Sequence, residues 1–450
     1  MKPTNEPQER KHEMTRQGTL HTNNNNRGRK RSLGAGVACT TLAAAAALLG
    51  LSPTVASAST PVVTLQFWNT YNPVGKPSEV STMQGILNRF EKENPGIKVV
   101  SVQVPYADLL AKFIAAAAAG NPPALLRSDI AWVPTLAADG VLLNMSRQKW
   151  AQPILKAALP GPLSTNYYQG SYYGIPDDTN TQAMFWNKTE FAAAGLSGPP
   201  TTLAQLWSDA ATLTNSAKGQ FGLSVGGTDL WNVAPFIWSD GGALTNSSLT
   251  SATGYMNGTA TESAISELVS LDKAGDIGSD FVGGSGAVSD ETGFSKGEYA
   301  IEIDGPWAVP TFGEAKGLNY GVATFPSGPG GSISTVGGED LAIARDAPNI
   351  ADAELLAAYL AEPYAQTQMA ARGDMAGYTA DAAREVKENP YLGIFAQQLL
   401  TAKARPVAPG YPELDADFTA ELQEIQAGKL DVSDAMNTAA QEANAALAAG

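Results

Sequence analysis

Histidine and cysteine are almost absent from this sequence. Its 450 residues include two histidines, His12 and His21, and one cysteine, Cys39. All three lie within the first 58 residues, which have the features of a leader that is removed. The chain that remains has neither residue type, so Ser-His-Asp and Cys-His catalysis, histidine-based zinc sites and disulfides are excluded. We expect neither a cofactor nor a resident metal.

The leader is typical of a secretory signal peptide. A basic region at residues 27–31 precedes an apolar run at 33–51, and Val55-Ala56-Ser57-Ala58 is a small-residue pattern that predicts cleavage after Ala58. Both Met1 and Met14 are possible starts. Cys39 does not resemble a lipidated cysteine, because the apolar run continues beyond it and Gly36 stands where an aliphatic residue is usual. No other run is long enough to span a bilayer, so we expect an exported, soluble protein at the cell envelope or outside the cell.

Positive charge is scarce in the chain that follows the leader. The leader holds 8 of the 29 Lys and Arg and 3 of the 44 Asp and Glu, which leaves 21 basic and 41 acidic residues, a net charge of −20. Such a chain repels nucleic acid and anionic membranes, and it disfavours a strongly anionic ligand. The remaining 392 residues (450 minus 58) exceed what one core usually holds and predict two lobes.

Short apolar strands alternate with helical patterns through most of this chain. Residues 62–68, 100–104, 183–186 and 221–225 are predicted strands, whereas Met83, Ile86, Leu87 and Phe90 recur at helical spacing. Residues 144–170 show weaker signals and are predicted to be irregular. The C-terminal part is predicted to be helical at 351–372, 395–404, 418–427 and 432–450. This alternation indicates an α/β protein with a parallel or mixed sheet.

The most informative stretch is 294–307. A turn at Lys296-Gly297 precedes an apolar strand, and Asp304-Gly305-Pro306-Trp307 ends that strand with a carboxylate and an indole. Ligands bind at the carboxyl ends of strands in open α/β sheets. An indole face and a carboxylate are what a neutral sugar needs, because one covers C–H groups and the other accepts from hydroxyls. A core tryptophan behind a turn is the plain alternative.

Several motifs occur in an order that resembles a known family. They are Phe67-Trp68-Asn69, the segment 88–96, the segment 129–143, the segment 173–188 and the Gly-Pro-Trp segment at 305–307. Together they resemble the extracellular solute-binding proteins, family 1, which are the maltose-binding-protein-like receptors of ATP-driven sugar importers. The likeness extends over essentially the whole chain after the leader.

The resemblance implies a periplasmic-binding-protein-like fold of type II. In this fold two α/β lobes are joined by a three-segment hinge, and the ligand cleft lies between them. The crossings are expected near 175–180, 336–339 and 373–378. The N-lobe would then be 59–175 with 338–374, and the C-lobe 176–337 with 375–450. Such a monomeric receptor closes on a carbohydrate and presents both lobes to the permease subunits of the importer.

The resemblance also implies candidate ligand-binding residues. Trp307 matches the stacking residue of the Gly-Pro-Trp segment, and the carboxylate of Asp304 precedes it. The remaining candidates fall in matching loops and crossings: Asn69, Tyr71, Asp129, Trp132, Asp178, Asn180, Asp229, Trp231, Gly338 and Glu339. Asn180 stands where the maltose binder has an acidic residue, so a carboxylate is either lost or supplied by Asp178. The region 411–418 lacks the Trp-and-Arg pair of the maltose binder, which leaves the identity of the sugar open.

Three other functions use the same residue types. A glycoside hydrolase needs a pair of carboxylates, for which Asp229, Asp304 and Glu339 are available. An iron-binding relative would use tyrosinates from the Tyr167-Tyr168 and Tyr172-Tyr173 pairs. A receptor for polyols or phosphorylated polyols would require clustered arginines, at least for the phosphorylated ones. The motif order favours a non-enzymatic sugar receptor over these alternatives.

Overall fold

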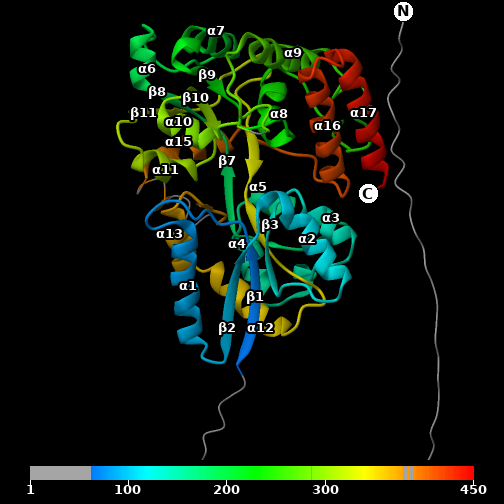
Figure 1. The fold of residues 1–450 in the computed structure, drawn as a ribbon. Coiled ribbons are helices and arrows are strands. Elements are labelled where there is room, and N and C mark those ends of the chain that lie inside the picture. Colours follow the sequence, from blue (N-terminus) through cyan, green and yellow to red (C-terminus); the bar gives the residue numbers. More distant parts are fainter. Residues whose placement is uncertain (1–61, 285, 379–383, 386, 388, 450) are drawn as a thin grey trace, which may run out of the picture. The chain divides into compact units, whose positions relative to one another are not determined.

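The computed structural model describes residues 62–284, 286–378, 384–385, 387 and 389–449. The predicted signal peptide and Cys39 lie outside these residues. Figure 1 shows two helix-flanked sheets with strands running between them. Each sheet forms one lobe, and the connecting strands form a third, smaller sheet.

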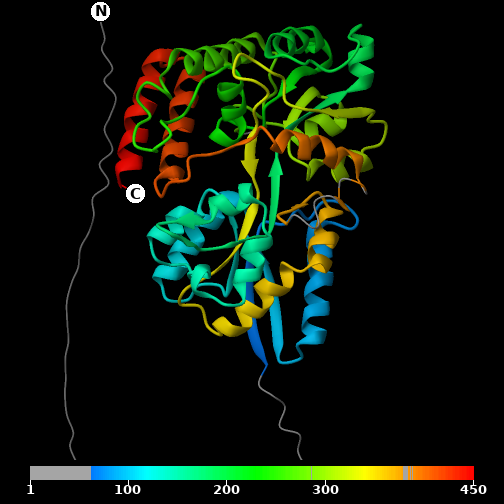
Figure 2. The ribbon, with the colours of Figure 1, turned by 180° about the vertical axis from the view of Figure 1, so that it is seen from behind.

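The first lobe is built on a five-stranded sheet of order β2-β1-β3-β13-β6. Strands β1 and β2 and strands β1 and β3 pair in parallel, whereas β13 runs antiparallel between β3 and β6. The strands are β1 (Val63–Asn69), β2 (Ile97–Gln103), β3 (Leu125–Asp129), β6 (Ile175–Pro176) and β13 (Glu339–Ile343). The flanking helices are α1 (Glu79–Glu93), α2 (Tyr106–Ala118), α3 (Val133–Ala138), α12 (Ile350–Leu360) and α13 (Pro363–Ala370). Seen from behind, the gold helices α12 and α13 cover this face of the sheet (Figure 2).

Helix α1 shows how local sequence defines these elements. The Ser78 hydroxyl accepts from the Ser81 backbone N–H and the Ser81 side chain returns the bond, which forms a capping box. Met83, Leu87 and Phe90 lie on its buried face, so the periodicity seen in the sequence is the packing face.

The second lobe is built on a four-stranded sheet of order β11-β8-β10-β9. Its strands are β8 (Ala183–Asn187), β9 (Phe221–Ser224), β10 (Tyr299–Asp304) and β11 (Tyr320–Ala323). The surrounding helices are α6 (Lys188–Ala193), α7 (Leu203–Leu213), α8 (Leu230–Ser239), α9 (Thr259–Ala274), α10 (Asp290–Lys296), α11 (Ala308–Glu314), α15 (Pro390–Leu399), α16 (Tyr411–Gln426) and α17 (Val432–Ala449). All six residues of β10 are buried, so helices cover both faces of this sheet.

A third sheet of order β14-β7-β12-β15 connects the lobes. Its strands are β7 (Asp178–Thr181), β12 (Thr335–Gly337), β14 (Met375–Ala376) and β15 (Lys403–Ala404). Strand β6 leads into β7, and β12 leads through Gly338 into β13, so consecutive strands lie in different sheets. At Gly338 φ is +130°, a conformation that strongly favours glycine, and an added Cβ would lie 2.6 Å from the Asp178 carbonyl oxygen.

Three predictions of secondary structure were wrong. Residues 144–170 contain a 3₁₀ turn (Met145–Arg147), α4 (Ala151–Ala157) and α5 (Pro160–Thr165), followed by β4 (Tyr167–Tyr168), which pairs with β5 (Ser171–Tyr172). These helices were not predicted because they contain prolines near their starts. Proline is tolerated in a first helical turn, but in a sequence it is usually taken to end a helix. The helix predicted at 395–404 instead begins at Pro390 and ends at Leu399, and β15 follows. Similarly, α16 begins at Tyr411, with a proline in its first turn, rather than at residue 418.

Candidate functional site

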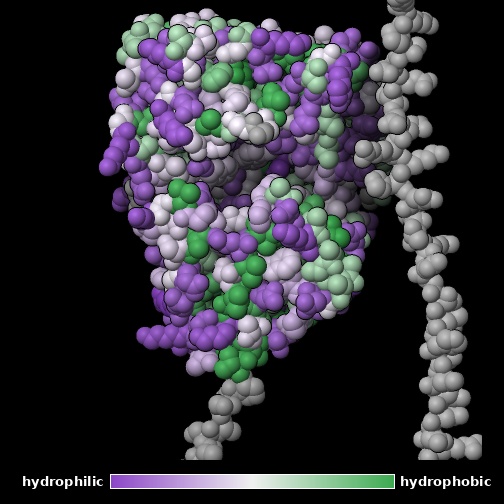
Figure 3. Space-filling model, in the orientation of Figure 1, coloured by the Kyte–Doolittle hydropathy of each residue, from purple (hydrophilic) through white to green (hydrophobic). Residues whose placement is uncertain are grey.

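A cavity of about 610 Å³ is lined by residues of both lobes and of the connecting strands. Figure 3 shows this face of the molecule hollowed between its two halves. The lining residues are Thr70, Asn72, Glu79, Tyr106, Ala107, Arg127, Asp129, Asn180, Asp229, Trp231, Asn232, Glu291, Trp307, Gly337, Gly338, Glu339, Gly373, Asp374, Arg405 and Asp415. The size falls within the range of small-molecule sites.

Two indoles, together with the Tyr106 ring, form the aromatic part of the lining. The ring centroids of Trp231 and Trp307 are 6.1 Å apart, and their planes are inclined by 35°. Trp231 lies in the first turn of α8, where the Asp229 carboxylate accepts from its backbone N–H at 2.9 Å. Trp307 follows the Gly-Pro turn at the end of β10 and is half-buried. Each indole is therefore positioned by a chain reversal next to a strand end.

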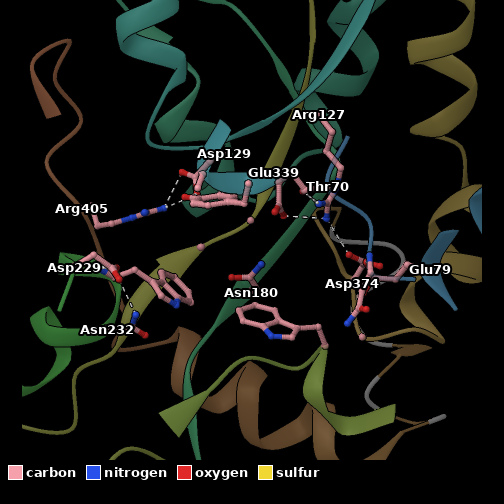
Figure 4. Close-up of a pocket in the computed structure, with 18 of the residues that line it drawn as sticks. Thr70, Glu79, Arg127, Asp129, Asn180, Asp229, Asn232, Glu339, Asp374 and Arg405 are labelled. Carbon is pink, nitrogen blue, oxygen red and sulfur yellow. Dashed lines mark hydrogen bonds and ion pairs between the residues drawn. The ribbon is translucent and has the colours of Figure 1, made fainter. Parts of the chain in front are cut away.

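Asn180 lies in the lining of the cavity (Figure 4), and both its Oδ1 and the Trp231 ring lie within 3 Å of the place of a Cβ on Gly337. Its side chain is 7% exposed, and its Oδ1 has no hydrogen-bond partner among the described residues. A buried amide oxygen without a partner is costly, because it has lost its bonds to water. Since Asn180 lines the cavity, a polar ligand there could supply the missing donor.

Gly337 leaves the space that Trp231 and Asn180 occupy. A Cβ at this position would lie 2.1 Å from Asn180 Oδ1 and 2.6 Å from the Trp231 ring. Both distances are far below a normal contact, so any larger residue would displace the indole or the amide. The glycine thus sets the shape of this part of the cavity.

Arg127 is the centre of a buried ion cluster at the other end of the cavity. Its Nη2 lies 2.5 Å from Asp178 and 3.0 Å from both Glu339 and Asp374, and its Nε lies 3.0 Å from Asp177. Burial raises the pKa of Asp177 to about 6, against the lowering effect of the guanidinium. One guanidinium therefore serves four carboxylates, and a local excess of negative charge remains.

Arg405 and Asp129 form the second buried pair. The guanidinium Nη2 donates to both oxygens of the Asp129 carboxylate, at 2.8 and 3.1 Å, and the Tyr106 hydroxyl donates to the same carboxylate at 2.8 Å. The guanidinium carbon also lies 5.4 Å from the Trp231 ring centroid and 5.5 Å from that of Tyr411. Region 411–418 has no Trp-and-Arg pair in its own sequence. Arg405, which precedes that region, nevertheless lies beside Trp231 of α8 and beside Tyr411.

The cavity lining is strongly acidic. Seven of its residues carry carboxyl groups, and only Arg127 and Arg405 carry positive charge: Glu79, Asp129, Asp229, Glu291, Glu339, Asp374 and Asp415. Burial, followed by the charge of Asp290, raises the pKa of Glu291 to about 7. Burial, followed by the charge of Asp229, likewise raises the pKa of Asp415 to about 7. An anion would add to this crowding, whereas hydroxyl or ammonium donors would relieve it.

Seven of the twelve candidate residues from the sequence lie in the lining. They are Asp129, Asn180, Asp229, Trp231, Trp307, Gly338 and Glu339. They come from β3, β7, α8, β13 and the loops beside them. The structure therefore brings together residues that are as many as 210 positions apart (339 minus 129).

The other five candidates lie outside the lining and contact other protein groups. Asn69 donates to Ser101 Oγ at 2.9 Å, and the Tyr71 hydroxyl donates to Asp177 at 3.0 Å. Trp132 packs on the Tyr106 ring with centroids 4.8 Å apart.

The two acidic members of that group, Asp178 and Asp304, are also engaged away from the lining. Asp178 belongs to the Arg127 cluster. Asp304 is buried beside Glu302 and Asp290. A strand end presents side chains to both faces, and the local pattern does not say which face meets the cavity.

Sequence reasoning missed several lining residues, of which the two arginines matter most. Arg127 carried a signal, because it follows the apolar pair Leu125-Leu126 within a short strand, and an arginine buried there must find acidic partners. Arg405 carried no signal, since it lies in a short loop after β15 and meets Asp129 from 276 positions away.

The residues required by the hydrolase and iron-binding alternatives can be compared with the cavity lining. Asp304, one of three carboxylates available to a hydrolase, does not line the cavity, whereas Asp229 and Glu339 do. The paired tyrosines lie in the β4–β5 hairpin, where the rings of Tyr167 and Tyr172 pack edge to face 5.2 Å apart. None of these tyrosines lines the cavity.

Comparison with known proteins places these features in context. Residues 85–392 match the family model described as bacterial extracellular solute-binding protein. The galactooligosaccharide-binding protein of Bacillus subtilis is 26% identical over 381 residues, which cover 80% of this chain and 85% of that protein. The multiple sugar-binding protein of Streptococcus mutans is 24% identical over 322 residues, with 66% and 71% covered.

Solved structures show the same fold. The GacH receptor of Streptomyces glaucescens, solved without ligand and with acarbose, has a TM-score of 0.77 at 25% identity and covers 86% of this chain and 99% of its own. A solute-binding protein of Thermotoga lettingae bound to α-D-tagatose has a TM-score of 0.77 at 24% identity, with 86% and 100% covered. These matches confirm the periplasmic-binding-protein-like fold of type II, with two α/β lobes joined by three segments. Among the described residues, no helix combines the length and apolarity needed to cross a membrane.

Proposed function

Because this chain belongs to the family of bacterial extracellular solute-binding proteins, we propose that it is the receptor of an ATP-driven carbohydrate importer. It captures a mono- or oligosaccharide in the cavity and delivers it to the membrane permease. The observation that carries the proposal is the pair of indoles, Trp231 and Trp307, in a cavity that Asn180, whose amide oxygen has no partner, also lines. Proteins of the same family that bind galactooligosaccharides and multiple sugars support it.

The chemistry of the lining suits a sugar. An indole face covers the C–H surface of a pyranose ring, and carboxylates accept charge-assisted hydrogen bonds from its hydroxyls. The inclination of 35° between the indoles suits two successive rings of an oligosaccharide better than one flat ring. We therefore favour an oligosaccharide over a monosaccharide.

The charge of the lining narrows the ligand class. Seven carboxyl groups face the cavity, and both arginines are paired with carboxylates. A phosphorylated polyol or a uronate would have to displace these carboxylates from Arg127 or Arg405. We propose a neutral or amino-bearing sugar as the ligand and regard anionic sugars as excluded.

The domain boundaries and the location of the protein form part of the proposal. We propose an N-lobe of residues 59–175 and 338–374 and a C-lobe of residues 176–337 and 375–450, with ligand binding coupled to lobe closure about the connecting strands. We also propose that residues 1–58 are a signal peptide that directs a monomeric receptor out of the cell. The function requires no chemical step, so the receptor should release its ligand unchanged.

The test is calorimetric titration of residues 59–450 with a panel of neutral, amino and acidic mono- and oligosaccharides. Tryptophan fluorescence is followed in parallel. We expect one-to-one binding at micromolar or lower Kd for a neutral or amino sugar, with intact sugar recovered afterwards. Release of shortened sugars would make the protein a glycoside hydrolase. If no sugar of the panel binds, or if acidic sugars bind best, the proposal is overturned. The next ligands to test would then be polyols, phosphorylated ligands and iron.

A further inference from the structure

Three carboxylates converge inside the second lobe, beneath the turn that carries Trp307. Glu302 and Asp304 are alternate residues of β10 and so point to the same face of the strand, and Asp290 is the first residue of α10. One carboxylate oxygen from each lies within 4.8 Å of the other two. This group, the α10–β10 carboxylate cluster, lies outside the cavity lining.

The cluster is buried and has no positive partner. Glu302 is 0% exposed and Asp304 is 5% exposed. Both carboxylate oxygens of Glu302 and Oδ2 of Asp304 lack a hydrogen-bond donor outside the cluster, and the two carboxyl groups can bond to each other only when one of them is protonated. Across the described ranges no ion pair joins any of the three to a lysine or arginine. Buried carboxylates without donors or cations are rare, because each loses several kcal/mol of hydration, of the order usually cited for ions in proteins.

The donors that are present serve other oxygens. The Glu291 backbone N–H donates to Asp290 Oδ1 at 3.0 Å, and the Gly305 backbone N–H donates to Asp304 Oδ1 at 2.7 Å. The remaining oxygens therefore have no cation to balance them, and any negative charge on them is uncompensated among the described residues. This arrangement differs from the Arg127 cluster, where a guanidinium stands at the centre.

We propose that the α10–β10 carboxylate cluster binds a calcium ion, in departure from the expectation of no resident metal. The ligand atoms are all hard carboxylate oxygens, which exclude soft metals. Two ligands on opposite sides of Ca²⁺ are about 4.8 Å apart at a bond length of about 2.4 Å, and the three oxygens lie within that distance of one another, so they can bind one such ion together. Mg²⁺ needs bonds of about 2.1 Å in near-ideal octahedral geometry and usually keeps several waters, so three buried carboxylates suit it less well.

Solvent can reach the cluster beside Asp290, and protons compete with a cation for the carboxylate oxygens. Asp290 is only half-buried, so an ion can enter beside it. Burial, and then the neighbouring carboxylates, raise the pKa of Glu302 and Asp304. Without a cation the charge is relieved by protonation, so calcium and protons compete for the same oxygens.

A bound ion would tie α10 to the end of β10. Asp304 is followed directly by Gly305-Pro306-Trp307, and Asp290 is followed by Glu291, which lines the cavity. Calcium would therefore stiffen the backbone on which one indole of the sugar site stands. This consequence rests on the proposed function, whereas the ion site itself does not.

The test measures ion binding without any sugar. Residues 59–450 are stripped with a chelator and titrated with CaCl₂, MgCl₂ or MnCl₂ at neutral pH, by calorimetry and by the shift in Tm. We expect one Ca²⁺ per chain, a rise in Tm of several degrees and clearly weaker binding of Mg²⁺. No binding of any of the three ions would overturn the proposal, and a preference for Mg²⁺ or Mn²⁺ would overturn the assignment to calcium.

Variants locate the site. Glu302→Gln should weaken Ca²⁺ binding at least tenfold, and Asp290→Asn, a change at a half-buried position, provides a second variant should the first not fold. Glu267→Gln, on an exposed position of α9, should retain the wild-type affinity for Ca²⁺. Binding that survives both cluster variants, or that is lost in Glu267→Gln, would place the ion elsewhere and overturn the proposal.

Discussion

The Arg405 guanidinium donates to both oxygens of the Asp129 carboxylate, at 2.8 and 3.1 Å, and so links the loop after β15 to the end of β3. The side chains are 4% and 10% exposed. Removing one partner of such a pair leaves a buried charge uncompensated. The pair therefore makes a specific prediction for stability.

Arg405→Met should lower the free energy of unfolding by about 3 kcal/mol, because Asp129 would lose its only positive partner among the described residues. Urea denaturation measures the loss. The double variant Asp129→Asn with Arg405→Met should lose less than the sum of the single losses. The control is Arg345→Met, which removes the exposed pair with Asp346 and should leave stability unchanged. Equal losses in the two arginine variants would contradict the prediction.

Trp307→Ala should weaken sugar binding by tens-fold, which is about 2 kcal/mol, because a stacking face in the cavity is lost. The far-ultraviolet circular dichroism spectrum should be unchanged, since the ring is only half-buried. Calorimetry with the best ligand of the panel measures the effect. Trp207→Phe is the control, because that ring stacks on Phe236 outside the cavity and should not affect affinity. An unchanged Kd in Trp307→Ala would remove this residue from the site.

Gly337→Ala should lower sugar affinity at least tenfold while the chain still folds. The added Cβ would lie 2.6 Å from the Trp231 ring and 2.1 Å from Asn180 Oδ1, so one of them must move. Titration of the purified variant measures this, and its intrinsic fluorescence should also change as the indole shifts. The matched control is Gly313→Ala in α11, where an added Cβ meets nothing within 4 Å. Wild-type affinity in Gly337→Ala would mean that the aromatic wall adapts freely and does not define the site.

Asp415→Asn should flatten the dependence of stability on pH. Burial raises the pKa of Asp415 to about 7 in the folded chain, whereas an unfolded aspartate ionises near pH 4. Between these values the folded state holds a proton that the unfolded state has released, so stability falls as pH rises. The variant still accepts a bond from the Leu230 N–H through Oδ1 and should gain about 1–3 kcal/mol over wild type at pH 8, with little gain at pH 4.

Thermal unfolding from pH 4 to pH 8 makes that comparison. Asp276→Asn serves as the control for the loss of one negative charge, because no ion pair is described for Asp276. A wild-type and an Asp415→Asn profile that run parallel over the whole range would show that this carboxyl group does not titrate with a raised pKa.

Much of the fold could be predicted because its signals are local. Short apolar runs predicted β1, and the helical spacing of Met83, Ile86, Leu87 and Phe90 predicted α1. The errors occurred where prolines open helices, as in α5 and α16, because the same residue type ends one helix and begins another.

The site was only partly predictable. Trp307 follows a Gly-Pro turn at a predicted strand end and can be recognised from neighbouring residues, whereas Trp231 and Asp229 were expected only from the resemblance to the family. Asp304 has the same local signals as these residues, yet it lies inside the lobe with Glu302. Nothing in a strand pattern tells which of two alternate faces will be covered by α10.

By itself, the sequence determined the α/β class, the negative charge, the absence of histidine and cysteine beyond residue 58, and the aromatic turn at 305–307. These are properties of composition and of short-range periodicity, which hold in any arrangement of the chain. Only the tertiary structure decided which charges meet. Arg405 reaches Asp129, and Arg127 gathers Asp178, Glu339 and Asp374, across separations of 51 to 276 residues. Charge pairing acts through a few ångströms of space rather than along the chain, and the packing of the lobes sets those distances.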